Sequence, residues 1–128
     1  MSSAFPPAFA DGVRRFNGGE YFEAHEAFED CLDAVESDDR WDLLVALIQV
    51  AVGYHKLASG HPGAARMLSL GAEKLAVFDA AAWGVGVGSL RHRAEADAAT
   101  IDAAAIRLST DPPRIDVEGG IVPSSHGT

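Results

Sequence analysis

The sequence has only one cysteine, Cys31, among its 128 residues. A single thiol excludes an intrachain disulfide and the Cys-x-x-Cys pairs of many redox and zinc sites. Nothing in the cysteine content therefore indicates an oxidising compartment. Because Cys31 lies within a helical pattern of apolar residues, we expect it to be a small buried or nearly buried side chain rather than a nucleophile.

Long apolar runs and targeting segments are also missing. The longest apolar stretch, residues 43–52, is interrupted by Gln49 and is too short to cross a lipid bilayer. The first residues lack the basic segment followed by an apolar one that is typical of a secretory signal peptide. We therefore expect a cytoplasmic protein that has no membrane partner.

Basic side chains are few: 10 Lys and Arg stand against 19 Asp and Glu, which gives a formal net charge of −9. Phosphate groups do not attract such a surface, so we expect no nucleic-acid partner. The charge instead favours the binding of cations or basic partners. Apolar residues make up 48% of the chain, which is typical of one folded domain with a real core.

No segment alternates apolar and polar residues with the period of two that β-strands need. Prolines, glycines and an acidic turn divide the chain into helical segments at residues 6–16, 20–35, 40–59, 62–78 and 89–108. The predicted fold is all-α, a compact antiparallel bundle of about four to five helices. We assign residues 1–110 to this single domain, with a flexible connection at residues 83–88. Residues 111–128, which begin with Asp-Pro-Pro, are expected to form a loose, extended or disordered tail.

The segment Tyr21–Glu29 sets one histidine and two carboxylates on a predicted helix. At about 100° per residue, Glu29 lies roughly 40° and Glu26 roughly 100° around the helix from His25. Imidazole and carboxylate groups both bind divalent ions, so His25 and Glu29 are a plausible pair of ligands. A protease-type zinc helix would need a second histidine where Glu29 stands.

His55 is the expected third ligand, because it follows the core-facing stripe of the next predicted helix. A short turn joins the two helices, so they should pack antiparallel and bring His55 level with residues 21–25. The predicted metal site is therefore His25, Glu29 and His55, holding zinc, manganese or iron, with Glu26 as the candidate catalytic base. Such a site would suit a metal-dependent hydrolase.

A purely structural interpretation of the same residues stays open. The carboxylates could pair with Arg14 or Arg15, His25 could bond to Glu29 within its own helical turn, and His55 could be a buried, hydrogen-bonded histidine. In that case the protein is a helical interaction module with a protein partner or a second copy of itself. The sequence contains neither a phosphate-binding glycine loop nor a Gly-x-Ser-x-Gly elbow, so neither of these motifs supports an enzyme.

Several motifs follow one another along the chain: Phe16-Asn17-x-Gly19-x-Tyr21-Phe22-Glu23-Ala24-His25-Glu26-x-x-Glu29, Leu47-Ile48-Gln49-x-Ala51 with Tyr54-His55, Gly60-x-x-Gly63-Ala64, and the ending Pro112-Pro113-Arg114-Ile115. In this order they resemble the bacterial and archaeal "domain of unknown function 309" family. The resemblance implies a small cytoplasmic all-helical bundle without an assigned activity.

The characteristic polar positions of that family correspond here to Asn17, His25, Glu26, Glu29, Gln49 and His55, and we predict these as the ligand-binding residues. The chain departs from the family at Leu32, where tryptophan is usual. It also has Val45-Ala46 where Gln-Gly is usual, which removes a polar side chain from the central helix.

Overall fold

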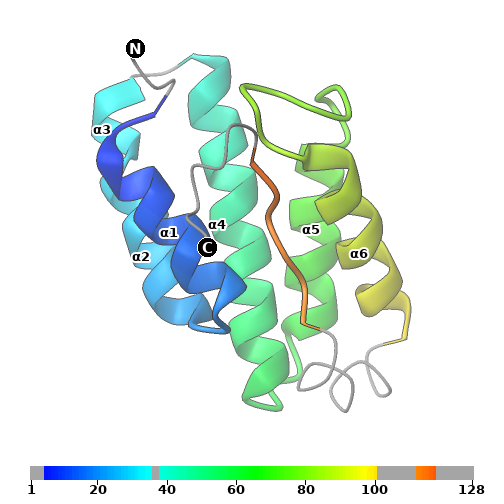
Figure 1. The fold of residues 1–128 in the computed structure, drawn as a ribbon. Coiled ribbons are helices and arrows are strands. Elements are labelled where there is room, and N and C mark those ends of the chain that lie inside the picture. The colour runs from blue at the N-terminus through cyan, green and yellow to red at the C-terminus, as the bar shows by residue number, and fades with distance from the viewer. Residues whose placement is uncertain (1–4, 36–37, 101–111, 118–128) are drawn as a thin grey trace, which may run out of the picture.

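The computed structural model describes residues 5–35, 38–100 and 112–117. These ranges contain α1 (Pro7–Asn17), α2 (Tyr21–Asp30), α3 (Leu32–Val35), α4 (Asp39–Ala58), α5 (Ala64–Leu75) and α6 (Val87–Ala99). The central helix α4 has α1 and α2 on one side and α5 and α6 on the other (Figure 1). The predicted all-α bundle is confirmed. Among the described helices, none combines the length and the hydropathy that crossing a membrane requires.

The helices begin and end at the proline, cap and glycine residues from which their boundaries were predicted. Pro7 opens α1, and Gly19, at a φ of +84°, turns the chain after it. The Asp38 side chain caps α4 by accepting a hydrogen bond from the backbone N–H of Arg40 at 2.8 Å. Gly60, at a φ of +71°, closes the far end of α4.

Two predicted segments differ from the structure. The expected single helix at residues 20–35 is divided at Cys31 into α2 and α3. The expected flexible connection at residues 83–88 is instead a two-residue turn, in which Ala82 and Val85 exchange two backbone hydrogen bonds, and α6 begins at Val87. Trp83 and Gly84 both have positive φ, as the tight turn between paired residues requires. The predicted continuation of the last helix, residues 101–108, lies outside the described residues.

Close approach of α4 and α5 builds the centre of the core. A side-chain carbon at Gly53 would stand 2.7 Å from Leu68, and one at Gly71 would stand 2.7 Å from Val50. Only glycine lets the two helix backbones come this near, so larger side chains from both helices pack around them. The α2 helix packs on another side of α4, with Phe28 fully buried beneath α1.

Residues 112–117 are extended, and they lie against the bundle rather than away from it (Figure 1). Ile115 is only 1% exposed and belongs to the same apolar core as the helices. The sequence predicted an extended tail but not this packing. Residues 118–128 of the predicted tail lie outside the described residues.

Cys31 predicts one pH dependence of stability. The thiol is fully buried, and this burial, helped by the charge of Asp30, raises the pKa of Cys31 from 9.0 to about 11. The folded chain therefore keeps the proton while the unfolded chain loses it, so stability present below pH 9 is lost as the pH rises toward 11. We expect a loss of about 2 kcal/mol across that interval. Urea unfolding at both pH values measures it, and the Cys31→Ala variant should lose correspondingly less; equal losses would contradict the prediction.

Candidate binding site between α2 and α4

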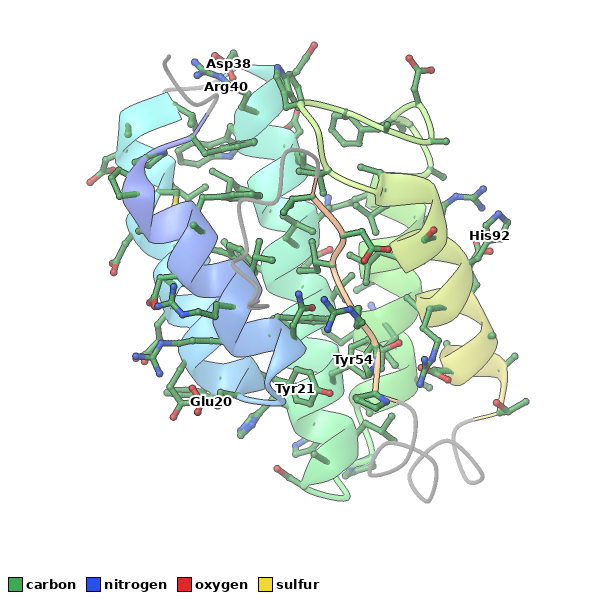
Figure 2. All side chains as sticks on the ribbon, in the orientation of Figure 1. Glu20, Tyr21, Asp38, Arg40, Tyr54 and His92 are labelled. Carbon is green, nitrogen blue, oxygen red and sulfur yellow. The ribbon has the colours of Figure 1, made fainter. Side chains whose placement is uncertain are left out.

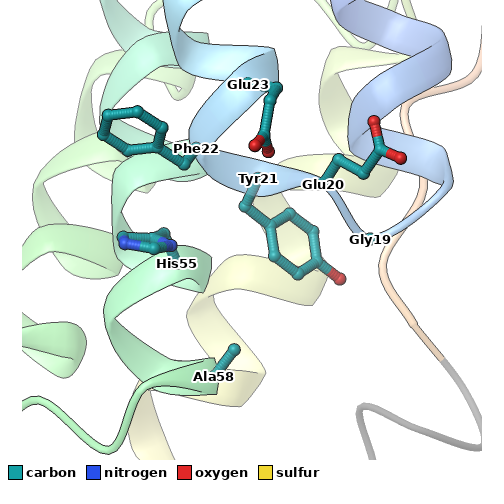
Figure 3. A pocket seen from close by; sticks show the side chains of 7 residues that line it. All are labelled: Gly19, Glu20, Tyr21, Phe22, Glu23, His55 and Ala58. Carbon is teal, nitrogen blue, oxygen red and sulfur yellow. The ribbon is translucent and has the colours of Figure 1, made fainter.

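The beginning of α2 faces the end of α4, as the predicted antiparallel hairpin requires (Figure 3). His55 therefore reaches the level of Phe22 and His25, as predicted, but its side chain is exposed and does not face the core as the sequence pattern had indicated. An aromatic ring lies between the two histidines: the ring centroid of Phe22 is 5.4 Å from that of His55 and 4.9 Å from that of His25. The sequence prediction brought the two histidines to the right place but omitted the side chain that both of them contact.

The predicted metal ligands do not combine into one group. His25 Nε2 lies 3.7 Å from Glu29 Oε1, so the expected contact within one helical turn is present. Its other ring nitrogen, Nδ1, is 2.8 Å from the carbonyl oxygen of Phe22. Both nitrogens of His25 thus face groups of α2 itself. Across residues 5–35, 38–100 and 112–117, no three His, Cys, Asp or Glu side chains are grouped so that they could hold a metal ion.

A shallow cavity of about 400 Å³ opens to solvent where the two helices meet. Figure 3 shows the aromatic ring of Phe22 and the imidazole of His55 beside it, with two carboxylates on the α2 side. The seven lining residues are Gly19, Glu20, Tyr21, Phe22, Glu23, His55 and Ala58. The cavity is therefore aromatic on one wall and acidic on the other.

The charge at this cavity is negative. Glu20 is partly neutralised, because Arg15 Nη1 lies 2.8 Å from its carboxylate. Glu23 is exposed and forms no hydrogen bond or ion pair with the described residues. The positive end of the α2 dipole and the negative end of the α4 dipole meet here, each equivalent to about half a charge, so they largely cancel. The uncompensated carboxylate of Glu23 decides the sign.

A buried polar network lies behind the cavity. The ring of Tyr21 is 5.6 Å from that of Tyr54, and Figure 2 shows the two together at the end of the bundle opposite Asp38. The Tyr54 hydroxyl donates to Asp97 Oδ2 at 2.6 Å, and Arg93 Nε donates to the same oxygen at 2.7 Å. This network joins α4 to α6.

Both tyrosines at this end stay protonated at neutral pH. Burial, followed by the hydrogen bond to Asp97, raises the pKa of Tyr54 far above its ordinary value. Burial also raises the pKa of Tyr21. Neither hydroxyl is thus prepared as a base or nucleophile. The sequence reasoning missed this network, although one signal was available: Asp97 falls on the apolar stripe of its helix, seven residues after Leu90 and three after Ala94.

Three other predicted site residues lie away from the cavity lining. Asn17 bonds through its side-chain amide to the backbone of Ile115. Glu26 is exposed on α2 and forms no hydrogen bond or ion pair with any described residue. Gln49 lies six residues before His55, about 120° away around α4. Its buried Oε1 has no hydrogen-bond partner in the part of the chain that the structure describes.

Comparison with known families agrees with the motifs. Residues 9–68 match the family model described as "Domain of unknown function (DUF309)". The chain carries a DUF309 domain. No curated protein and no solved structure matches the chain.

The DUF309 match begins within α1 and ends within α5, so it contains every residue that lines the cavity. Asp97, Arg93 and the segment 112–117 lie beyond the matched residues. The cavity is accordingly built from residues inside the matched range, whereas the buried network reaches α6 beyond it.

Proposed function

We propose that this DUF309 protein is a helical binding module whose cavity between α2 and α4 takes a positively charged side chain of a protein partner. The observation that carries the proposal is Phe22. Phe22 is 45% exposed and lines the cavity, although its ring lies between two histidines on an otherwise well-packed helix pair. An exposed aromatic face beside an unpaired carboxylate is the usual chemistry of cation recognition.

The size and charge of the cavity support a side chain of an arginine or a lysine. A volume of about 400 Å³ lies within the range of small-ligand sites, and its openness suits a group presented on another protein. Phe22 offers the π face and Glu23 the counter-charge. Arginine combines both contacts best, because its planar guanidinium stacks on rings and pairs with carboxylates.

The surrounding sequence supports a basic partner as well. Residues 20–39 contain nine acidic side chains and no lysine or arginine. The negative field of this segment would attract a basic protein and raise its association rate at low ionic strength. We also propose a cytoplasmic location, because nothing in the cysteine content of the chain calls for an oxidising compartment.

The metal site predicted from the sequence has less support than the binding proposal. His25 and Glu29 provide two ligands, whereas a catalytic zinc site commonly uses three protein ligands. The described residues therefore do not fit a preformed metal-dependent hydrolase, and we derive no reaction from them. Melting curves with zinc, manganese or iron test the hypothesis directly: a rise in Tm that His25→Ala removes would restore it, and an unchanged Tm would end it.

The binding proposal predicts a selective response to a guanidinium probe. We expect Nα-acetyl-arginine amide, added to the ¹⁵N-labelled chain, to shift the amide signals of residues 19–23 and of His55. Phe22→Ala should weaken this binding about tenfold, because the cation–π contact is lost. Glu23→Gln should weaken it too, and added salt should do the same.

Matched variants separate the cavity from general surface effects. Trp83 is 42% exposed and lies away from the cavity, so Trp83→Ala should bind the probe like the unchanged chain. Glu73→Gln on α5 is the corresponding control for Glu23→Gln. Equal shifts with the neutral Nα-acetyl-glutamine amide, or unchanged binding by Phe22→Ala, would overturn the proposed function.

A further inference from the structure

The extended segment 112–117 is held mainly through its backbone. Asn17 uses both ends of its side-chain amide: Oδ1 accepts from the N–H of Ile115 at 2.7 Å, and Nδ2 donates to the carbonyl of Ile115 at 3.0 Å. Further along, Gly86 N–H donates to the carbonyl of Asp116 at 2.8 Å. Val117 then pairs with Val85 as an antiparallel bridge. We call Asn17, Val85 and Gly86 the peptide-binding surface.

The side chains of the segment alternate between the protein and the solvent. Pro113 and Ile115 are buried, whereas Pro112, Arg114 and Asp116 are exposed. This period of two is that of a β-strand laid on a surface. Domains that bind an extended peptide use the same two kinds of contact: hydrogen bonds to the peptide backbone and burial of alternate side chains. Residues 112–117 are thus bound as a peptide ligand would be.

Glycine at position 86 permits this close approach of the segment. A side-chain carbon at this position would stand 3.3 Å from the Asp116 side chain and 3.5 Å from the Asp116 carbonyl oxygen. The charges of the segment, in contrast, do not contribute to its attachment. Arg114 and Asp116 are 3.9 Å apart and pair with each other, and both side chains are more than half exposed. What the surface recognises is a backbone with apolar side chains two positions apart.

We infer that the peptide-binding surface at the end of α1 and the start of α6 is a second interaction site, which the chain fills with its own segment 112–117. Its partner is an extended segment of another protein with apolar residues at alternate positions, as in Pro-x-Ile. Such a segment must displace residues 112–117, so the contact is autoinhibitory. This site is separate from the cavity between α2 and α4, and either one can fail its test while the other stands.

The test uses the full chain with its own segment released. In Ile115→Asp, the buried contact of the segment is lost, and we expect the variant to bind a fluorescent peptide of residues 111–118 by anisotropy. The unchanged chain should bind it at least about tenfold more weakly, because a tethered segment competes at an effective concentration on the order of millimolar. Adding Asn17→Ala to the variant should abolish the binding. A peptide with aspartate in place of isoleucine is the control.

A second measurement does not depend on the folding of that variant. Unlabelled peptide at about 5 mM should displace part of the tethered segment in the unchanged ¹⁵N-labelled chain. The amide signals of Ile115 and Val117 would then move toward free-peptide positions, while the Asn17 side-chain amide stays in its bound position. No change at those signals, or no peptide binding by a helical Ile115→Asp chain, would overturn the inference.

Discussion

Replacing Asp97 with alanine is expected to lower the free energy of unfolding by about 3 kcal/mol, among the largest losses for any single polar residue here. Asp97 is only 2% exposed and accepts hydrogen bonds from both Tyr54 and Arg93. Alanine would leave the Tyr54 hydroxyl in a fully buried position without its partner. Tyr54→Phe should cost less, about 2 kcal/mol, because the contact between Asp97 and Arg93 would remain.

The same helix supplies a matched control. Arg91 and Glu95 form an ion pair at 3.0 Å with the same spacing as Arg93 and Asp97, but the Glu95 side chain is 47% exposed. Glu95→Ala should therefore change stability by less than about 0.5 kcal/mol. Urea unfolding of the variants measures the difference. Equal small losses for Asp97→Ala and Glu95→Ala would show that burial does not set the strength of this network.

Phe28→Ala is expected to destabilise the fold by about 3–5 kcal/mol, whereas Phe22→Ala on the same helix should cost less than about 0.5 kcal/mol. Phe28 is fully buried and packs against Phe9, with ring centroids 5.7 Å apart. Removing its ring would leave a cavity that the neighbouring helices cannot fill. Phe22, at 45% exposure, leaves no comparable cavity.

The pair of variants separates folding from binding. Phe22→Ala should melt like the unchanged chain and yet lose arginine binding, which is the behaviour of a binding residue. Thermal unfolding by circular dichroism and the arginine titration are performed on the same samples. A large stability loss in Phe22→Ala would assign the ring a structural role instead and would contradict our account of the cavity.

Most helix ends could be predicted because their causes are local. Proline at the start of α1, the Asp38 cap and the positive-φ glycines at positions 19 and 60 act within a few residues of chain. The turn at Trp83 and Gly84 was harder to predict. Its paired conformation depends on Val85, which is buried and also pairs with Val117, more than thirty residues away.

The candidate site was predicted only in part. The helical period placed His25 beside Glu29, and the short turn between helices brought His55 to their level. The same period could not show that the Phe22 ring would stand against both histidines. Phe22 does lie outside the apolar stripe of Tyr21 and Phe28, which is a signal for an exposed aromatic residue. Asn17 gave no comparable signal, because its partner is the backbone of Ile115.

The sequence by itself determined the all-α class, most of the helix ends, the acidic character and the antiparallel placement of the two histidines. These properties depend on composition, on helical period and on turn residues, all of which act over short stretches. Only the tertiary structure decided that Phe22 faces the cavity, that Asp97 is buried with Tyr54, and that Asn17 holds the segment 112–117. Each of these contacts joins residues distant in the chain, and their partners are selected by packing rather than by spacing.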